Sequence, residues 1–172
     1  MIKKIEFIAT GDTLINVELE NEKTSIKFSD IYPYWDYATE ENFEGGFAKI
    51  IEDKILFTMH TASMQGGIIG LWNAKTQKIE HISDGSYCVS ADFVNEKIYI
   101  LLCISNFETP ASFSLWQIPV GVMDAFAESE KIDVELPGLI EEFNGDIGSV
   151  ELEVQEDGYS IKLNDKVMFF SN

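Results

Sequence analysis

Alternation of apolar and polar residues over short runs is the feature that most constrains how this chain of 172 residues can fold. Residues 13–19, 150–154 and 159–163 alternate in this way. Because successive side chains of a β-strand point to opposite faces, such runs predict strands with one buried and one exposed face. Turn-forming residues such as Gly11-Asp12 and Asn164-Asp165 separate the runs. The pattern predicts about eleven or twelve strands in one antiparallel all-β domain spanning residues 1–172, and only residues 120–127 read as helical.

A repeat is visible within this pattern. Residues 48–57 align with residues 91–100 at an offset of 43, and Leu71-Trp72-Asn73 aligns with Leu115-Trp116-Gln117 at an offset of 44. Residues 78–80 then align with 131–133, so the second copy contains nine extra residues where the short helix is expected. Each copy reads as two hairpins, and we expect degenerate units before residue 47 and after residue 138.

A four-stranded unit of this length resembles a blade of the β-propellers of the WD-repeat or Kelch kind. The resemblance covers two units and lacks the Gly-His and Trp-Asp signatures of WD repeats. It implies an antiparallel meander of four-stranded, propeller-like units. The alternative is a β-sandwich or open barrel, because half-buried hairpins of any such fold obey the same pattern.

The charge balance narrows the possible partners. Thirty acidic residues stand against twelve basic residues, all of them lysines, which gives a net charge of −18. Nucleic-acid binding needs cationic side chains that neutralise phosphates, so we do not expect it here. The longest apolar run, residues 98–104, is far shorter than the ~20 residues that cross a bilayer. The first residues lack the apolar core of a signal peptide, so we expect a cytoplasmic protein without a membrane partner.

Candidate catalytic and metal-binding residues are few. His60 and His81 lie outside every metal-binding pattern, although a serine or cysteine that meets His81 in the fold remains an alternative. Asn144-Gly145-Asp146 offers oxygen ligands but lacks the spacing of a calcium loop. Cys88 and Cys103 are expected to be buried, reduced thiols, with a disulfide between them as the alternative. We therefore predict a protein without metal or cofactor that is not an enzyme.

Two segments are candidates for binding a partner. The first, residues 31–46, breaks the alternation and reads as a long loop; we call it the aromatic loop. The second, residues 124–157, holds twelve acids and one lysine; we call it the acidic segment. Aromatic side chains are typical of binding hot spots, whereas the alternatives are a satellite core for the aromatics and a solvated face for the acids. The candidate partner-binding residues are Tyr32, Tyr34, Trp35, Asp36, Tyr37, Glu40, Glu41, Glu44, Glu128, Glu130, Asp133, Glu141, Glu142 and Asp146.

In its size, acidity and lack of catalytic motifs the chain is similar to bacterial immunity proteins of contact-dependent inhibition and related toxin systems. This resemblance is one of composition, and it carries no residue of any family onto this chain. It implies an inhibitor that binds a basic, nuclease-like toxin domain and occludes its active site, with carboxylates in the place of substrate phosphates. The alternatives are a carbohydrate- or small-ligand-binding module, with Trp35, Tyr34 and Tyr37 stacking on a sugar, and a structural assembly domain.

Overall fold

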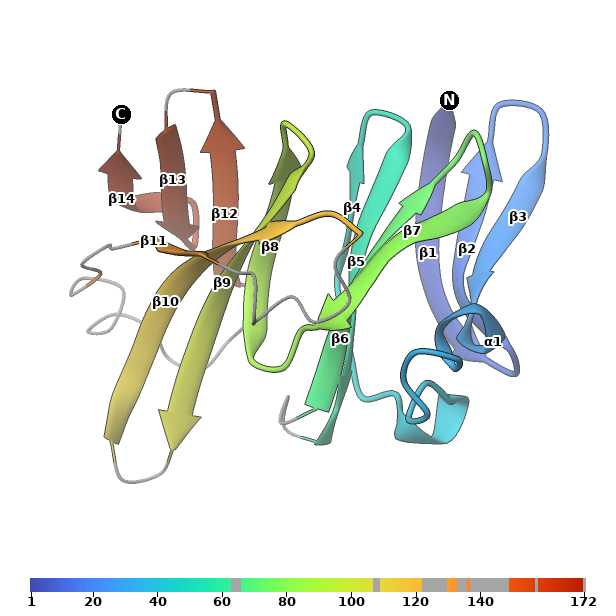
Figure 1. The fold of residues 1–172 in the computed structure, drawn as a ribbon, viewed down its shortest axis with the longest axis horizontal. Helices are drawn as coiled ribbons and strands as arrows, with labels where there is room; N and C mark the ends of the chain where they lie inside the picture. The colour runs from blue at the N-terminus through green and yellow to red at the C-terminus, as the bar shows by residue number, and fades with distance from the viewer. Residues whose placement is uncertain are drawn as a thin grey trace. The chain divides into compact units, whose positions relative to one another are not determined.

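A computed structural model describes residues 1–62, 66–106, 109–121, 130–132, 136, 149–156 and 158–171. Within them the chain forms fourteen strands in four antiparallel sheets of three or four strands each (Figure 1). The all-β, antiparallel prediction is confirmed, with two strands more than the upper count expected. The chain divides into two compact units, Met1–Ser86 with Gly121–Met123, and Tyr87–Val120 with Asp124–Asn172. The prediction of a single domain stays a prediction.

The first unit contains two sheets in simple meander order, β1-β2-β3 and β4-β5-β6-β7. Their core is a cluster of buried side chains that includes Leu14, Ile26 and Phe57. The strands are β1 (Ile2–Thr10), β2 (Thr13–Leu19), β3 (Lys23–Lys27), β4 (Ala48–Ile51), β5 (Lys54–Thr61), β6 (Gly66–Asn73) and β7 (Lys78–Asp84). Two short helical segments, α1 (Phe28–Ile31) and η1 (Glu40–Asn42), lie between β3 and β4.

The second unit repeats the arrangement, with sheets β11-β10-β9-β8 and β12-β13-β14. Ser90 and Asp92 on β8 fasten β12 to it: Ser90 Oγ accepts the Leu152 N–H at 2.8 Å, and Asp92 Oδ2 accepts the Val154 N–H at 2.8 Å. The strands are β8 (Cys88–Val94), β9 (Lys97–Asn106), β10 (Thr109–Pro119), β11 (Glu130–Ile132), β12 (Val150–Gln155), β13 (Gly158–Leu163) and β14 (Lys166–Ser171).

The predicted repeat corresponds to the two four-stranded sheets. Ala48 pairs with Phe57 across β4 and β5, and the aligned residues Ala91 and Ile100 pair across β8 and β9. The sheets that precede and follow the repeat have three strands each, in line with the expected degenerate units. The sequence repeat is therefore a repeat of meander topology.

The second hairpin of the repeat is out of register. Trp72 pairs with Ile55, whereas the aligned Trp116 pairs with Ile100, which is two residues further along its strand than the repeat would place it. Because side chains alternate with a period of two, this shift keeps both tryptophans on the same relative face. The difference in register therefore leaves the apolar pattern intact.

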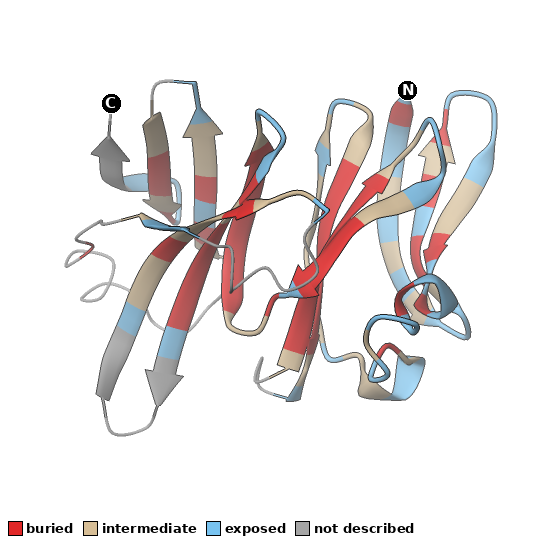
Figure 2. Ribbon diagram, viewed as in Figure 1, coloured by how far each residue is buried: buried red, intermediate tan, exposed pale blue. Residues whose placement is uncertain are grey.

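The central strands are buried more fully than simple alternation predicts. All six interior residues of β5 and of β6 are buried, as are the first six residues of β8 (Figure 2). A strand covered on both faces loses the alternation of apolar and polar residues. The runs Ile55–His60 and Cys88–Phe93 are therefore near-continuous in burial, and they include the polar residues Thr58, His60, Ser90 and Asp92.

The helical content differs from the prediction. The described helical segments are α1 and η1, which fall near and within the aromatic loop, where no helix was expected. Of the predicted helix at residues 120–127, only residues 120 and 121 are described, and both belong to a turn; the rest lies outside the described residues. No described helix has the length and apolar character needed to cross a membrane.

Candidate functional site

Buried side chains in the aromatic loop and in α1, where the loop begins, hold the loop to the first unit. Phe28 and Ile31 of α1 are buried in the core cluster, and so is Ala38. The ring of Phe43 stacks on that of Phe7 of β1, with the centroids 5.9 Å apart. The satellite-core alternative is therefore right for some of the loop's side chains. It does not apply to the tyrosines.

The loop is also fastened to the turn between β1 and β2. The Asp12 carboxylate accepts hydrogen bonds from the Ser29 backbone N–H at 2.9 Å and from Ser29 Oγ at 2.7 Å. These bonds lower the pKa of Asp12 because they stabilise its charged form. On the far side of the loop, Glu40 Oε2 accepts the Gly11 N–H at 2.8 Å. Ser29, just before the aromatic loop, and Glu40, within it, thus both bond to the turn between β1 and β2.

The end of the loop lies against β5. The N–H of Glu44 donates to the carbonyl of His60 at 3.0 Å, and the N–H of His60 donates to the carbonyl of Gly45 at 2.8 Å. A Cβ on Gly46 would collide with the carbonyl oxygen of Thr58. Only glycine permits this close approach of two backbones. Gly46 therefore lets the end of the aromatic loop pass close to β5 as the chain enters β4.

With its apolar side chains anchored, the loop presents its tyrosines to solvent. Tyr32, Tyr34 and Tyr37 are 53%, 56% and 58% exposed. Trp35 is half-buried, and its ring lies 5.9 Å from that of Tyr37. Of the predicted acidic residues in the loop, Asp36, Glu40, Glu41 and Glu44 are all exposed. The structure therefore brings eight of the predicted residues together on one segment, seven of them exposed.

Charge is divided unequally between the two ends of the strands in the first unit. Counted with the strand residues that flank them, the described connections of the first unit at the end that carries the aromatic loop are residues 10–13, 27–48, 61–62, 66 and 84–86. We call this end the loop end. Its connections contain one lysine, Lys27, and seven carboxylates, Asp12, Asp30, Asp36, Glu40, Glu41, Glu44 and Asp84.

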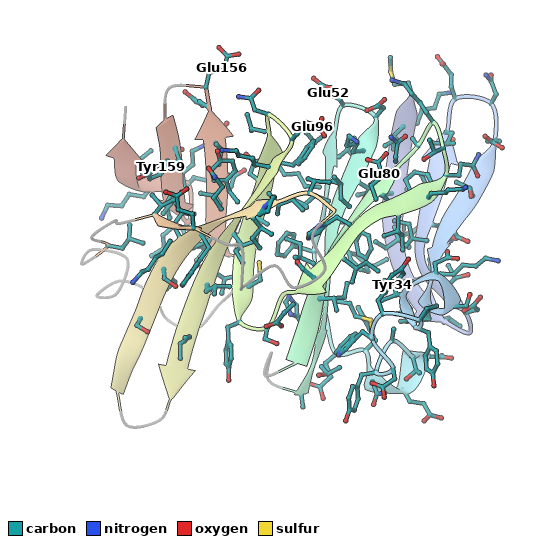
Figure 3. All side chains as sticks on the ribbon, viewed as in Figure 1. Tyr34, Glu52, Glu80, Glu96, Glu156 and Tyr159 are labelled. Atoms are coloured by element: carbon teal, nitrogen blue, oxygen red, sulfur yellow. The ribbon has the colours of Figure 1, made fainter. Side chains whose placement is uncertain are left out.

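The opposite end has a mixed charge. Counted with the strand residues that flank them, the turns between β2 and β3, between β4 and β5, and between β6 and β7 contain four lysines and four carboxylates: Lys23, Lys54, Lys75, Lys78, Glu20, Glu22, Glu52 and Asp53. Lys75 pairs with Asp53 there, and Lys54 pairs with Glu80. Figure 3 shows Tyr34 toward the loop end and Glu52 at this opposite end. The concentration of unbalanced negative charge in the first unit is therefore at the loop end.

A groove lies beside the tyrosines at the loop end. It has a volume of about 320 Å³, and we call it the Trp35 groove. Tyr34 and Trp35 line it, together with the buried residues Ile68 of β6 and Ile82 of β7 and with Asp84 at the end of β7. On the other side of the loop, a shallower hollow of about 360 Å³ is lined by residues that include Asp12, Tyr32 and Glu40.

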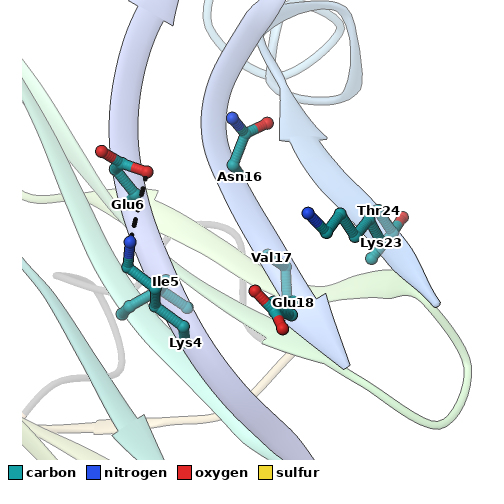
Figure 4. Close-up of a pocket in the computed structure, with 8 residues that line it drawn as sticks. All are labelled: Lys4, Ile5, Glu6, Asn16, Val17, Glu18, Lys23 and Thr24. Carbon is teal, nitrogen blue, oxygen red and sulfur yellow. Dashed lines mark ion pairs between the residues drawn. The ribbon is translucent and has the colours of Figure 1, made fainter. Parts of the chain in front are cut away.

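A further hollow of about 230 Å³ lies across β1, β2 and β3 (Figure 4). Lys4, Glu6, Glu18 and Lys23 line it, and Lys4 Nζ lies 3.7 Å from Glu6 Oε2. Charges of both signs alternate over this surface, and no aromatic side chain lines it. It therefore offers neither the charge bias nor the stacking surface found at the loop end.

A serine and a histidine do meet in the first unit. His81 Nε2 lies 2.8 Å from Ser83 Oγ, and both residues are buried on β7. The Gly121 N–H donates to His81 Nδ1 at 3.0 Å, so Nδ1 carries no proton. The single proton of the neutral ring is then on Nε2, which donates to Ser83 Oγ. A general base must instead accept the serine proton, so the pair is not arranged for nucleophilic catalysis.

The other candidate groups, His60, Cys88 and Cys103, are also buried. His60 is 6% exposed, and neither ring nitrogen has a hydrogen-bond partner in the described part of the chain. Burial lowers the pKa of both His60 and His81 to about 4. Cys88 and Cys103 are buried and form no disulfide, as expected; Cys88 Sγ donates to the Ser90 carbonyl at 3.4 Å, and burial raises the pKa of Cys103 to about 11. Among the described residues, no three His, Cys, Asp or Glu side chains gather as metal ligands.

Most of the acidic segment lies outside the described residues, including the predicted binding residues Glu128, Asp133, Glu141, Glu142 and Asp146. Glu130 begins β11 and is exposed. On β12, Glu153 pairs with Lys162 of β13 at 2.7 Å, and this pairing raises the pKa of Lys162. Part of the segment's charge is thus balanced locally. Apart from Glu130, the candidate binding residues that the structure describes lie in the first unit.

Sequence reasoning missed three contributors to the loop end, Asp12, Asp30 and Asp84. Each of them follows a strand or begins the loop region, so each looks like an ordinary turn residue. The available signal was the direction of the strands: in an antiparallel meander, every second turn falls at the same end of the sheet. Counting charge over alternate turns would have found them.

No protein-family model, curated protein or solved structure gives a significant match to this chain. The functional argument therefore depends on the geometry and charge of the loop end.

Proposed function

We propose that this protein is a non-catalytic inhibitor that binds a basic protein partner through the loop end of its first unit. The partner that fits this surface is a cationic, nuclease-like toxin domain, and the protein would act as its cytoplasmic immunity protein. Neither metal nor cofactor is needed for this role.

The observation that carries the proposal is the combination of exposed tyrosines with unbalanced carboxylates. Tyr32, Tyr34 and Tyr37 are each more than half exposed, and the same end of the unit has seven carboxylates against one lysine, Lys27, in its connections. Tyrosine buries a large area at little cost in side-chain entropy, which favours it in binding surfaces. Complementary charge accelerates association, and buried aromatic anchors slow dissociation.

Inhibition would follow from occlusion. A nuclease binds substrate phosphates through lysine and arginine, and a surface of carboxylates presents the same sign of charge to those groups. Asp12 and Glu40 are held in place by their bonds to Ser29 and Gly11, so part of this surface is preorganised. Preorganisation lowers the entropy lost on binding.

The test is capture of partners from lysate of the native cell, at low and high salt, with the captured proteins identified by mass spectrometry. We expect one strongly basic protein whose recovery falls steeply as salt screens the charges. Its activity should then be inhibited by the purified protein. A captured partner that is neutral or acidic, or a basic one that remains fully active in the complex, would contradict the proposal.

Variants separate the loop end from general acidity. Tyr34→Ala and Tyr37→Ala remove exposed side chains and should weaken binding of the captured partner by about tenfold or more each if they act as hot spots. Glu20→Gln, in the turn between β2 and β3 at the opposite end, removes one charge and should leave binding unchanged. Equal loss in all three variants would point to a surface other than the loop end.

A sugar-binding role makes the opposite prediction about salt. Trp35, Tyr34 and Tyr37 could stack on a sugar ring, and the Trp35 groove lies beside them. Stacking on a neutral sugar hardly depends on ionic strength, whereas binding of a basic protein does. Binding in glycan screens that persists at high salt would favour this second candidate.

For the fold we propose that the four meanders are blade-like repeats of a small propeller. Support comes from the matching strand order of the two four-stranded sheets and from the equivalent pairing of Ala48–Phe57 and Ala91–Ile100. A crystal structure tests this directly. A ring of four blades around a common axis would support it, and two sheets stacked face to face as a sandwich would refute it.

A further inference from the structure

We propose that the Trp35 groove binds the side chain of one arginine of the partner, with its guanidinium group against Trp35 and Asp84. This inference rests on the proposed function, because it names the group of a basic partner that the loop end would recognise.

The wall of the groove suits a flat cation. Tyr34 is exposed and Trp35 half-buried, and both line the groove. A Cβ on Gly66 would lie 3.7 Å from Cζ2 of Trp35, so the indole ring packs close to the backbone at the start of β6. A cation over an aromatic face is attracted by the negative charge of the ring's π-system, most strongly for tryptophan.

Asp84 supplies the negative charge. One of its oxygens, Oδ1, accepts both the Ser86 backbone N–H at 2.9 Å and Ser86 Oγ at 2.7 Å. These bonds fix the orientation of the carboxylate. The other oxygen, Oδ2, has no hydrogen-bond partner in the described part of the chain, and Asp84 itself is exposed. A fixed carboxylate with an available oxygen is an acceptor for a cationic donor.

The aromatic side chains also suit the stem of a long side chain. Ile68, Ile82 and Gly67 line the groove but are buried, so the apolar surface open to a stem comes from Tyr34 and Trp35. Methylene groups of an arginine can pack there while the guanidinium reaches Asp84. Arginine fits better than lysine, because its planar group both stacks on aromatic rings and donates several hydrogen bonds to a carboxylate.

The charge of the surroundings selects the same occupant. The loop end contributes seven carboxylates and one lysine, so an anionic side chain would be repelled from the groove. The hollow between β1, β2 and β3 has lysines of its own and lacks this selectivity. Charge complementarity therefore commits the groove to a cationic occupant.

The test is a titration of the ¹⁵N-labelled protein, followed by amide chemical shifts, with two capped tripeptides. One has arginine between two glycines, and the other has citrulline, which keeps the shape of arginine without its charge. We expect the arginine peptide to shift the amides of Gly67, Ile82 and Asp84 saturably. The citrulline peptide should bind at least about threefold more weakly because it lacks the cation–π and ionic contributions.

Three variants complete the experiment. Asp84→Asn keeps an acceptor for Ser86 and should weaken binding of the arginine peptide about three- to tenfold. Tyr34→Ala, at an exposed position where folding is not at risk, should weaken it similarly. Glu20→Gln removes the same charge as Asp84→Asn but lies far from the groove, and it should have no effect.

Equal binding of the two peptides would overturn the proposal, and so would equal affinities of the Asp84→Asn and Glu20→Gln variants. Absence of shifts at the groove would overturn it too, while salt-sensitive capture of a basic partner by the same protein would leave the proposed function standing. Conversely, an arginine peptide that binds as described, in a protein that captures no basic partner, supports the groove and refutes the inhibitor function.

Discussion

The two buried histidines make a sharp prediction about stability, because they have the same pKa but different surroundings. Replacing His60 with leucine removes a ring whose two nitrogens have no partner in the described part of the chain. Replacing His81 with leucine removes the acceptor of the Gly121 N–H and the donor to Ser83 Oγ. At pH 7 we expect His60→Leu to be neutral or stabilising and His81→Leu to lose about 1–3 kcal/mol.

The pH dependence gives the larger effect. The unfolded chain takes up a proton on each histidine near pH 6.5, whereas the folded chain does so only near pH 4. Between these values the unfolded state binds more protons than the folded state. The contribution of each neutral histidine to the free energy of unfolding is therefore fully present above pH 6.5 and is lost as the pH falls toward 4. The separation of the two pKa values corresponds to a limit of roughly 3 kcal/mol per histidine. About 2 kcal/mol of this is reached at pH 5.

The assay is urea unfolding at pH 7 and pH 5, followed by tryptophan fluorescence, since Trp72 is 2% exposed and reports on the first unit. Between these pH values the His60→Leu variant should lose about 2 kcal/mol less stability than the wild type. The titrating carboxylates are common to both proteins, so their effect cancels in the comparison. If the variant and the wild type lose equal stability, the reasoning that His60 stays neutral in the folded protein is wrong.

Three further outcomes follow from packing and burial. Asp92→Ala removes the acceptor of a β12 amide and should lower the free energy of unfolding by about 1–3 kcal/mol in urea denaturation; an unchanged midpoint would refute the role of this bond. Gly70→Ala places a methyl group against the ring of Phe57 and should cost about 1–3 kcal/mol, whereas Gly45→Ala, with open space around the added carbon, should lie within about 0.5 kcal/mol of the wild type. The raised pKa of Cys103, about 11, predicts that iodoacetamide at pH 8 labels it slowly in the native protein and rapidly in urea, and equal rates would contradict its burial.

The turns show how much local sequence can predict. Asn164-Asp165 was recognised as a turn from residue type, and both residues have positive φ in the structure, as do Asn95 and Glu96 between β8 and β9. Asparagine and aspartate tolerate this region, and two residues of positive φ in succession match the tight turn of a β-hairpin. The turn between β13 and β14 could therefore be located from sequence.

The candidate site was predictable only in part. The aromatic loop was recognisable because it breaks the alternation, and its tyrosines are exposed as a binding surface requires. Which of its side chains are anchors was not readable: Phe43 stacks on Phe7, and Trp35 packs close to Gly66, across distances in sequence that no local pattern encodes.

The sequence by itself determined the strands, their antiparallel order and the repeat, because period-two alternation and turn residues act between near neighbours in the chain. Only the tertiary structure decided that Asp84 shares a groove with Trp35, and that Asp12 fastens the start of the loop through Ser29. It also decided that His81 donates a hydrogen bond to Ser83. Each of these relations joins groups on different strands or connections, or depends on what a third residue donates. They are set by how sheets pack and by which hydrogen bonds remain to be satisfied, and neither is written in the local pattern of residues.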